Sequence, residues 1–293
     1  MRKGIGTVRQ RASRRDKRRM SKADPRVVET VMTQVRAALG EKNHRPVVIG
    51  LCGAQGSGKT TLARAALDAC GLEGLRTAAL SIDDLYLTRA EREGLARNVH
   101  PLLATRGVPG THDVLLGLSL VDALQDGKAA ALPRFDKGRD DRAPADTWAS
   151  APADCDVLLF EGWCVGARPQ PEQDLSEPVN ALEAEEDAGG DWRRYVNAAL
   201  AGAYQDLFAR IDRLVLLAAP GFEVLYGWRL EQERDLGAKA DANAKVMDEA
   251  ALARFIAHYE RLTRYILYEM PDRADLVVSL DADRYPVEIQ QRR

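Results

Sequence analysis

The chain has 293 residues, 45% of them hydrophobic, and a formal net charge of −2. This length can bury the core of one large α/β domain, or of one domain with a small appendage. The longest apolar runs, such as residues 47–52 and 156–160, fall well short of the roughly 20 residues that a membrane-spanning helix needs. The composition therefore excludes a repeat array or low-complexity polymer, and no membrane span is predicted.

The four cysteines, Cys52, Cys70, Cys155 and Cys164, have no C-x-x-C spacing, and three of them lie in or beside apolar runs. Cysteines in such runs are usually buried thiols rather than zinc ligands. We therefore expect no zinc site and a reduced, cytoplasmic location.

The N-terminal segment differs in charge from the remainder. Residues 1–22 carry ten Lys or Arg and one Asp, so subtracting this charge of +9 from the total leaves about −11 for the other residues. The segment has neither apolar periodicity nor the apolar core of a secretory signal. We expect a basic, disordered tail over residues 1–23 and one folded domain over 24–293; an organellar transit peptide or a nucleic-acid-binding arm remains open.

The first predicted element is a helix that begins after Asp24, has Pro25 in its first turn and ends at Gly40. Short β-rich runs then alternate with helical patterns at 47–52, 76–82, 156–160, 212–219 and 275–280. Continuous hydrophobicity in such runs is typical of parallel strands buried on both faces. The predicted fold is a three-layer α/β sandwich with a mainly parallel sheet and helices on both faces.

Three stretches interrupt this alternation, at roughly 97–113, 133–155 and 170–192. Long loops in compact domains are often binding loops or lids, so the first two are where we expect substrate contacts. The third stretch is acidic, with Glu183, Glu185, Glu186 and Asp187. Because no Gly-punctuated Asp/Asn spacing accompanies these residues, we expect a solvated face rather than a metal site.

The strongest motif follows the first predicted strand and is a complete G-x-x-x-x-G-K-[ST] sequence at 53–60, followed by a helical run that stops at Gly71. Glycines let successive backbone N–H groups point at phosphate oxygens, Lys59 can reach the β- and γ-phosphates, and the Thr60 hydroxyl can bind Mg²⁺. We predict an ATP-binding P-loop made of Gly53, Ala54, Gln55, Gly56, Ser57, Gly58, Lys59, Thr60 and Thr61.

Carboxylates follow the next two predicted strands. Asp83 and Asp84 follow the second, and Glu161 follows the third. In open α/β sheets this carboxyl edge is where ligands bind, so one aspartate can accept the proton of an attacking hydroxyl and Glu161 can help hold Mg²⁺. An Asp-Asp pair could otherwise serve as a helix cap.

Five segments occur in this order: SIDDLY (81–86), RGVPGTHD (106–113), PRFDKGRDDR (133–142), FEGW (160–163) and WRLEQE (228–233). Together they resemble the plant- and fungal-type D-glycerate 3-kinase family, which is related to uridine kinase, pantothenate kinase and phosphoribulokinase. The resemblance covers roughly residues 45–288 and implies a P-loop kinase fold with a lid.

The resemblance also implies roles for single residues. Asp83 falls on the catalytic base and Glu161 on the Mg²⁺-linked acid, while Arg229 lies in the lid segment that folds over the phosphates, with Arg234 a second candidate there. Arg142 falls on an arginine that contacts acceptor or phosphate. Phe135 departs from the tyrosine that related uridine kinases have.

Charge in the two long loops favours an acidic acceptor, because guanidinium and ammonium groups pair with carboxylates. The predicted acceptor-binding residues are Asp84, Tyr86, Arg106, His112, Asp113, Arg134, Lys137 and Arg142. The resulting hypothesis is a kinase that uses ATP and Mg²⁺ on a small hydroxy acid, with D-glycerate as the favoured acceptor and Lys59, Asp83 and Arg229 as catalytic residues.

Two alternatives stay open at this point. The acceptor could be pantothenate, a nucleoside or another small metabolite, because the whole kinase group shares the P-loop and both acids. The chain could instead be a nucleotide-binding regulator or RNA-associated factor, although no nucleic-acid motif follows residue 22. The sequence leaves the oligomeric state undetermined.

Overall fold

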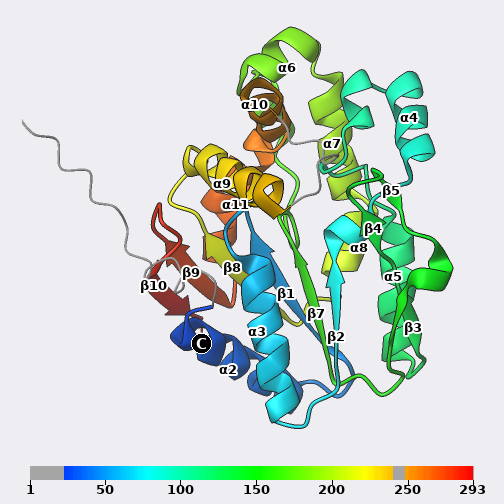
Figure 1. Cartoon of the computed structure of the whole chain (residues 1–293), viewed down its shortest axis with the longest axis vertical. Helices are drawn as coiled ribbons and strands as arrows, with labels where there is room; N and C mark the ends of the chain where they lie inside the picture. Colours follow the sequence, from blue (N-terminus) through cyan, green and yellow to red (C-terminus); the bar gives the residue numbers. More distant parts are fainter. Residues whose placement is uncertain (1–22, 240–247, 293) are drawn as a thin grey trace, which may run out of the picture.

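The computed structural model describes residues 23–239 and 248–292, so residues 1–22 of the predicted tail lie outside it. Its centre is a six-stranded sheet in the order β10-β9-β8-β1-β7-β2 (Figure 1). The strands are β1 (Val47–Gly53), β2 (Thr77–Ser81), β7 (Val157–Gly162), β8 (Arg213–Ala218), β9 (Leu276–Leu280) and β10 (Pro286–Gln291). All neighbours pair in parallel except β9 and β10, which are antiparallel.

Helices and short strands make up the connections. The α-helices are α2 (Pro25–Glu41), α3 (Lys59–Leu72), α4 (Arg89–Asn98), α5 (Val114–Gln125), α6 (Ala181–Glu186), α7 (Asp191–Ala201), α8 (Ala203–Phe208), α9 (Val224–Lys239), α10 (Glu249–Ala257) and α11 (Glu260–Glu269). The 3-10 helices are η1 (Ile82–Leu85), η2 (Pro101–Ala104), η3 (Ala145–Thr147), η4 (Glu172–Leu175) and η5 (Met270–Asp272). Two small antiparallel sheets pair β3 (Ala130–Leu132) with β6 (Ala149–Ala151), and β4 (Phe135–Asp136) with β5 (Asp141–Arg142).

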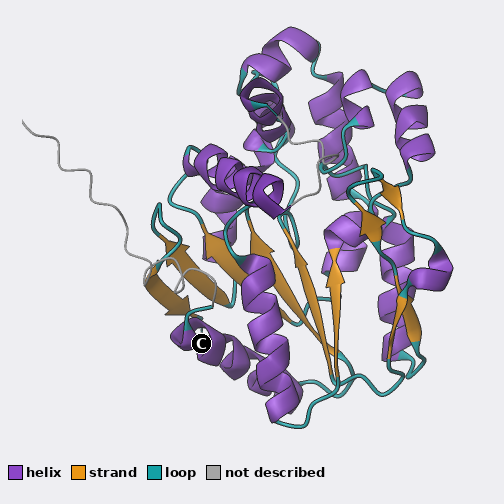
Figure 2. Ribbon diagram, viewed as in Figure 1, coloured by secondary structure: helices purple, strands orange, loops and turns teal. Residues whose placement is uncertain are grey.

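Every residue of β1 and β7 is buried, so both faces of the sheet must be covered. Helices α2 and α3 cover one face, through a core that includes Val31 and Leu62. Helices α5, α8 and α11 cover the other, through a core that includes Leu120, Leu207 and Ile266. Figure 2 shows the resulting layers of helix, sheet and helix, and the predicted three-layer α/β fold is confirmed.

The sequence patterns located the main elements well. Asp24 caps α2 by accepting a 2.8 Å hydrogen bond from the Arg26 N–H, and Pro25 begins the helix. Helix α2 continues through Gly40 to Glu41, and α3 continues through Gly71 to Leu72, so neither glycine ends its helix. All five predicted strands exist, with ends shifted by one or two residues.

The strands that the sequence patterns missed are short or polar. Strand β10 is an edge strand in which only two of six residues are even half-buried, so it lacks the apolar run by which the other strands were recognised. The stretch predicted as a loop at 133–155 contains β4, β5 and β6, which are two or three residues long. Such strands are too short to show a period in sequence.

The acidic stretch is not simply a solvated face, and for Glu183 and Asp187 that expectation was wrong. Each side chain is only 1% exposed. Glu183, in α6, pairs with Arg261 at 2.6 Å, and Asp187 pairs with Arg193 at 3.0 Å. An arginine 78 residues away in the sequence and another only six residues away thus neutralise acids that look solvent-exposed in the sequence.

Within residues 23–239 and 248–292, the four cysteines are buried and unpaired, and no cluster of three or more His, Cys, Asp or Glu could hold a metal ion. None of the helices described there combines the length and apolar character that crossing a bilayer requires.

Candidate active site

The P-loop joins the end of β1 to the start of α3. Gly56 and Gly58 have φ angles of 81° and 90°, in the left-handed region that favours glycine. Helix α3 then begins at Lys59, so its N-terminal N–H groups and positive dipole end face the same side as the loop. This arrangement suits the phosphates of a nucleotide.

Helix α9 packs directly against this loop. A Cβ at Gly56 would lie 2.7 Å from the Cβ of Trp228, so only glycine allows this close approach. Trp228 is buried, and its indole N–H donates to the Ala282 carbonyl at 2.6 Å. Figure 1 shows α9 above the carboxyl ends of the strands, which is where a lid belongs.

Glu161, at the end of β7, lies beside the P-loop. The Thr60 hydroxyl donates to its Oε1 at 3.3 Å, while its Oε2 is buried with no hydrogen-bond partner in the described part of the chain. Burial raises the pKa of Glu161, and nearby Lys59 partly opposes this effect. The Thr60 hydroxyl and the Glu161 carboxylate, with its unpartnered oxygen, fit Mg²⁺, which usually takes one or two protein ligands and fills its other positions with water and phosphate.

Asp83 lies in η1, just beyond the end of β2. Its Oδ1 accepts a 2.8 Å hydrogen bond from the Tyr86 hydroxyl, and its Oδ2 pairs with the Lys137 ammonium at 2.7 Å. Burial raises the pKa of Asp83, but the charges of Lys137 and Lys59 and these hydrogen bonds outweigh burial and hold it below its usual range. The carboxylate is therefore ionised and lies near the P-loop lysine.

Asp84 points to a different part of the site. Its Oδ1 accepts a 3.0 Å hydrogen bond from the Phe135 N–H, and Arg134 lies 3.4 Å from its Oδ2. Burial raises the pKa of Asp84. In this structure Asp84 does not cap a helix; it fastens strand β4 to η1.

Arg142 and Asp113 form a second link between the loops. Arg142 donates to the Tyr86 carbonyl and to Asp113, both at 3.1 Å. Asp113 also caps α5 by accepting from the Leu116 N–H. Both predicted acceptor residues therefore have partners within the protein.

Arg106 belongs to a network that sequence reasoning did not anticipate. It forms an ion pair with Asp140, which also pairs with Arg92 at 3.0 Å. The guanidinium groups of Arg92 and Arg106 lie 5.9 and 5.5 Å from the centroid of the Phe135 ring. Arg92 is only 2% exposed, and nothing in its helical sequence context marks it as buried.

His112, a predicted acceptor residue, packs between Tyr86 and Tyr204. It is buried, its Nδ1 is 2.6 Å from the Tyr204 hydroxyl, and its ring stacks on Tyr86 with 4.7 Å between centroids. Burial lowers the pKa of His112 to about 4, so the ring is neutral near pH 7. Tyr204 already occupies one of its nitrogens, and its predicted contact with acceptor hydroxyls stays a prediction.

Arg229 lies on α9, next to Trp228. Its guanidinium lies 5.7 Å from the centroid of the Phe255 ring in α10, and it donates to Gln232 at 3.1 Å. Arg234 is exposed further along the same helix. The two lid candidates thus share a helix that touches the P-loop.

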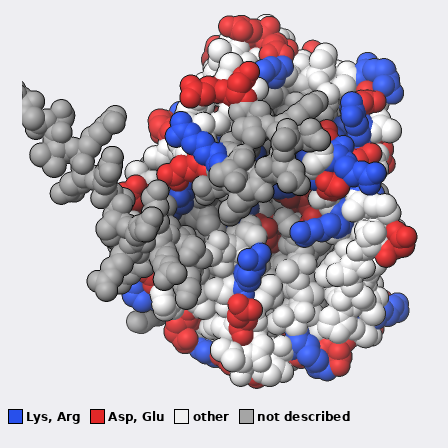
Figure 3. Space-filling view, in the orientation of Figure 1, with Lys and Arg blue, Asp and Glu red and all other residues white. Residues whose placement is uncertain are grey.

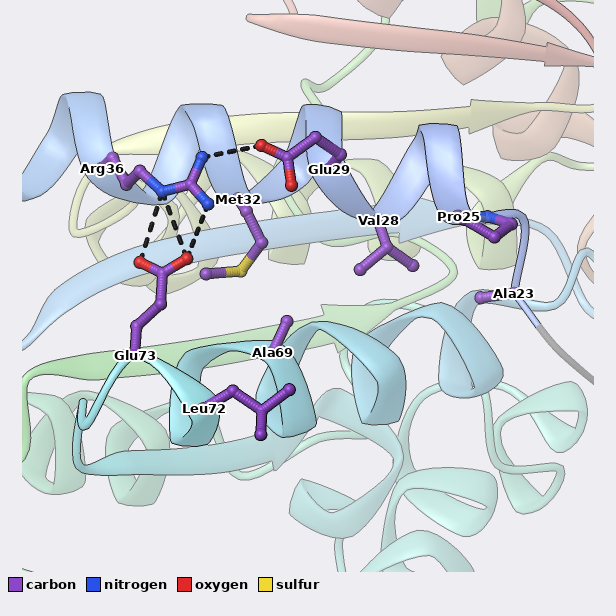
Figure 4. A pocket seen from close by; sticks show the side chains of 9 residues that line it. All are labelled: Ala23, Pro25, Val28, Glu29, Met32, Arg36, Ala69, Leu72 and Glu73. Carbon is purple, nitrogen blue, oxygen red and sulfur yellow. Dashed lines mark hydrogen bonds and ion pairs between the residues drawn. The ribbon is translucent and has the colours of Figure 1, made fainter.

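A shallow groove of about 420 Å³ lies elsewhere, between α2 and α3 (Figure 4). Its floor includes Met32 and Ala69, and the pair Arg36 and Glu73 bridges one end. Ala69 is ten residues along α3 from Lys59, about 15 Å by helix rise, so this groove is separate from the P-loop.

On the face in Figure 3, Lys and Arg are interspersed with Asp and Glu on the described residues.

The geometry defines a class of protein. A P-loop between a buried parallel strand and a helix binds a nucleoside triphosphate, and the neighbouring strands bring carboxylates to the same edge. A lid helix lies over the loop, and a second set of loops surrounds the carboxylates. This is the site of a P-loop phosphotransferase.

Comparisons with known proteins agree with this class. The chain is 34% identical over 259 residues to an uncharacterized kinase of Schizosaccharomyces pombe, covering 83% of this chain and 91% of the yeast protein. It is 31% identical over 260 residues to the chloroplastic D-glycerate 3-kinase of Arabidopsis thaliana, covering 83% of this chain and 54% of the plant protein. No protein-family profile matches the chain.

A solved structure is similar over almost the whole fold. The D-glycerate 3-kinase of Cryptococcus neoformans superposes with a TM-score of 0.75 at 26% identity, covering 91% of this chain and 98% of the fungal chain. The chain belongs to the family of P-loop kinases that includes these D-glycerate 3-kinases. It is a phosphotransferase that acts on an alcohol group, and the similarity implies the use of ATP.

Proposed function

We propose that the protein phosphorylates a small hydroxy acid with ATP and Mg²⁺, and that the acceptor is D-glycerate, converted to 3-phosphoglycerate. One observation carries the proposal. The carboxylate of Asp83, near the P-loop lysine, pairs with Lys137, and the same two loops carry three further cations. These are Arg106, Arg134 and Arg142, which pair with Asp140, Asp84 and Asp113. A carboxylate acceptor could pair with such cations, whereas a neutral acceptor has no need of them.

The contacts of Asp83 support its role as the base. Tyr86 holds Oδ1, and Lys137 occupies Oδ2, where an acceptor hydroxyl would bind. An incoming hydroxy acid would displace the Lys137 ammonium, whose side chain is 59% exposed and can move. Lys137 would then be available to pair with the acceptor carboxylate.

The transfer step follows from these positions. The acceptor hydroxyl oxygen attacks the γ-phosphorus, its proton passes to Oδ2 of Asp83, and the bond from the γ-phosphorus to the bridging oxygen of ADP breaks. Lys59 would stabilise charge on the γ-phosphoryl oxygens, and Arg229 would do so if α9 closes further. Thr60 and Glu161 would hold Mg²⁺, which neutralises phosphate charge when bound.

The test is an acceptor panel assayed for ADP release, with the product identified by ³¹P NMR. D-Glycerate should have a kcat/KM at least about 10²-fold above that of glycerol, which lacks the carboxylate. Similar values for the two compounds would contradict a carboxylate-binding site. Turnover of pantothenate or a nucleoside in preference to glycerate would replace the acceptor while keeping the kinase assignment.

A further inference from the structure

Tyr204, in helix α8, reaches the acceptor side of the site from the opposite half of the chain. Its side chain is only 3% exposed. The hydroxyl oxygen lies 2.9 Å from the Gly110 nitrogen and 2.6 Å from Nδ1 of His112. Nothing in the sequence pattern of α8 distinguishes this tyrosine from an ordinary core residue.

These contacts decide which nitrogen of His112 carries the proton. The Gly110 N–H can only donate, so the Tyr204 oxygen accepts from it. If Tyr204 then donates to Nδ1, the Nε2–H of His112 is the one group among Gly110, Tyr204 and His112 that lacks a partner within the described residues. In the other tautomer, both the hydroxyl proton of Tyr204 and the lone pair of Nε2 would lack a hydrogen-bond partner, and burying two such groups costs more free energy than burying one. Tyr204 therefore holds His112 as the neutral Nε2–H form.

The imidazole in turn supports Tyr86. The two rings stack with an interplanar angle of 26°, and the backbones of Tyr86 and His112 form an isolated antiparallel bridge. The edge of Phe135 packs against Tyr86 from another direction, with the ring planes at 81°. Tyr86 is buried, so its hydroxyl can move little, and it donates to Oδ1 of Asp83.

We propose that Tyr204 is a positioning residue for phosphoryl transfer, acting through His112 and Tyr86 to fix the rotation of the Asp83 carboxylate. Oδ1 is held by Tyr86, and Oδ2 is presented to the acceptor hydroxyl. The inference rests on the proposed function of Asp83 as the base. It assigns to His112 a supporting role within the protein instead of the substrate contact that the sequence suggested.

A double-mutant cycle of Tyr86→Phe and Tyr204→Phe tests whether the two hydroxyls act as one unit. Tyr86→Phe should lower kcat about tenfold, the effect of losing one hydrogen bond, and Tyr204→Phe about threefold to fivefold. Because Tyr204 acts through Tyr86, adding Tyr204→Phe to Tyr86→Phe should cost less than about twofold more. The KM for ATP should stay within about twofold of wild type, because the P-loop is untouched.

Tyr195→Phe is the matched control. Tyr195, in α7, lies beside Gly110 as Tyr204 does, and its hydroxyl makes no hydrogen bond within the described residues. Its kcat should equal that of wild type. If Tyr204→Phe lowers kcat by the same factor in both backgrounds, or no more than Tyr195→Phe does, the positioning role is wrong.

Histidine ¹⁵N NMR of the full chain gives a second readout that needs no substrate. The sequence has four histidines, and His112→Gln identifies the resonances of His112. Wild type should show a hydrogen-bonded, unprotonated Nδ1, and Tyr204→Phe should move that resonance toward an unbonded nitrogen. A protonated Nδ1 in wild type, or an unchanged resonance in the variant, would overturn the inference.

The two proposals can fail separately. The kinetic cycle is run with whichever acceptor of the panel the wild type uses. Absence of turnover with D-glycerate would contradict the proposed acceptor, whereas the cycle and the NMR measurement would still decide the role of Tyr204.

Discussion

Replacing Glu183 by Gln should destabilise the protein more than its place in an acidic run suggests. Glu183 accepts from the Arg261 guanidinium at 2.8 and 2.6 Å and from the Val179 N–H at 3.0 Å. Its side chain is 1% exposed and that of Arg261 is 9% exposed. The pair ties α6 to α11, and α6 contributes to the apolar cluster around Leu102 and Trp192.

The magnitude follows from what the change leaves behind. Glutamine keeps the size and one acceptor oxygen but removes the negative charge, so the buried guanidinium is left with neutral acceptors alone, the amide oxygen and the Asp174 and Glu177 carbonyls. Breaking a buried pair from one side costs about 3–5 kcal/mol. At about 2–4 °C per kcal/mol for a domain of this size, Tm should fall by roughly 6–20 °C.

Helix α6 offers its own control. Glu186 pairs with Arg254 at 2.6 Å, but these side chains are 42% and 47% exposed. An exposed pair contributes about 0–1 kcal/mol, so Glu186→Gln should leave the free energy of unfolding nearly unchanged. Urea unfolding of both variants, followed by far-UV circular dichroism, gives the comparison. A difference below about 1 kcal/mol between them would refute the assignment of Glu183 as a buried, stabilising partner.

The remaining predictions concern the candidate site. Lys59→Ala should nearly abolish turnover with the fold intact, and a variant retaining more than about a tenth of wild-type kcat would count against the P-loop role. Asp83→Asn should lower kcat by about 10² to 10⁴ with little change in the KM for ATP. Asp84→Asn, which disturbs the hydrogen bond that holds β4, should lower kcat less and Tm more. A larger loss of kcat at Asp84 would reverse the two roles. Because burial holds the pKa of His112 at about 4, below its unfolded value of about 6.5, the unfolded chain binds the extra proton between these pH values. The stability from His112 should be complete above about pH 6.5 and fall by about 2 kcal/mol on going to pH 5; equal pH dependence of unfolding in wild type and His112→Gln would contradict this.

The adjacent aspartates show where the sequence stops being informative. Their order along the chain makes them equivalent candidates for the base, and only the resemblance ranks Asp83 first. The structure separates their surroundings, because Asp83 meets Lys137 and Asp84 meets the Phe135 N–H. Consecutive residues leaving a strand point in different directions, and what each meets depends on a hairpin about 50 residues away in sequence.

The cationic acceptor residues show the same limit. The sequence places Arg106, Arg134, Lys137 and Arg142 in the two long loops, and each is paired with a carboxylate of the protein in this structure. Asp140, the partner of Arg106, lies within the PRFDKGRDDR segment, but the sequence analysis gave it no role. A residue type and its spacing cannot show which of several nearby acids a flexible cation will contact.

By itself, the sequence determined the parallel sheet, the P-loop and the start of α3, because these depend on local chemistry: a continuous apolar run, glycines at fixed spacing, and a lysine and threonine at the head of a helix. Tertiary structure alone decided the partners of Asp83, the burial of Glu183 and Arg92, and the contact of Tyr204 with His112. Most of these contacts join segments between roughly 50 and 90 residues apart, as in Lys137–Asp83, Glu183–Arg261 and Tyr204–His112. The exceptions are the Tyr86–Asp83 bond and the contact of Arg92 with Ala104, 12 residues away. No local periodicity reports such contacts, since they form only when the packed helices and sheet bring those side chains together.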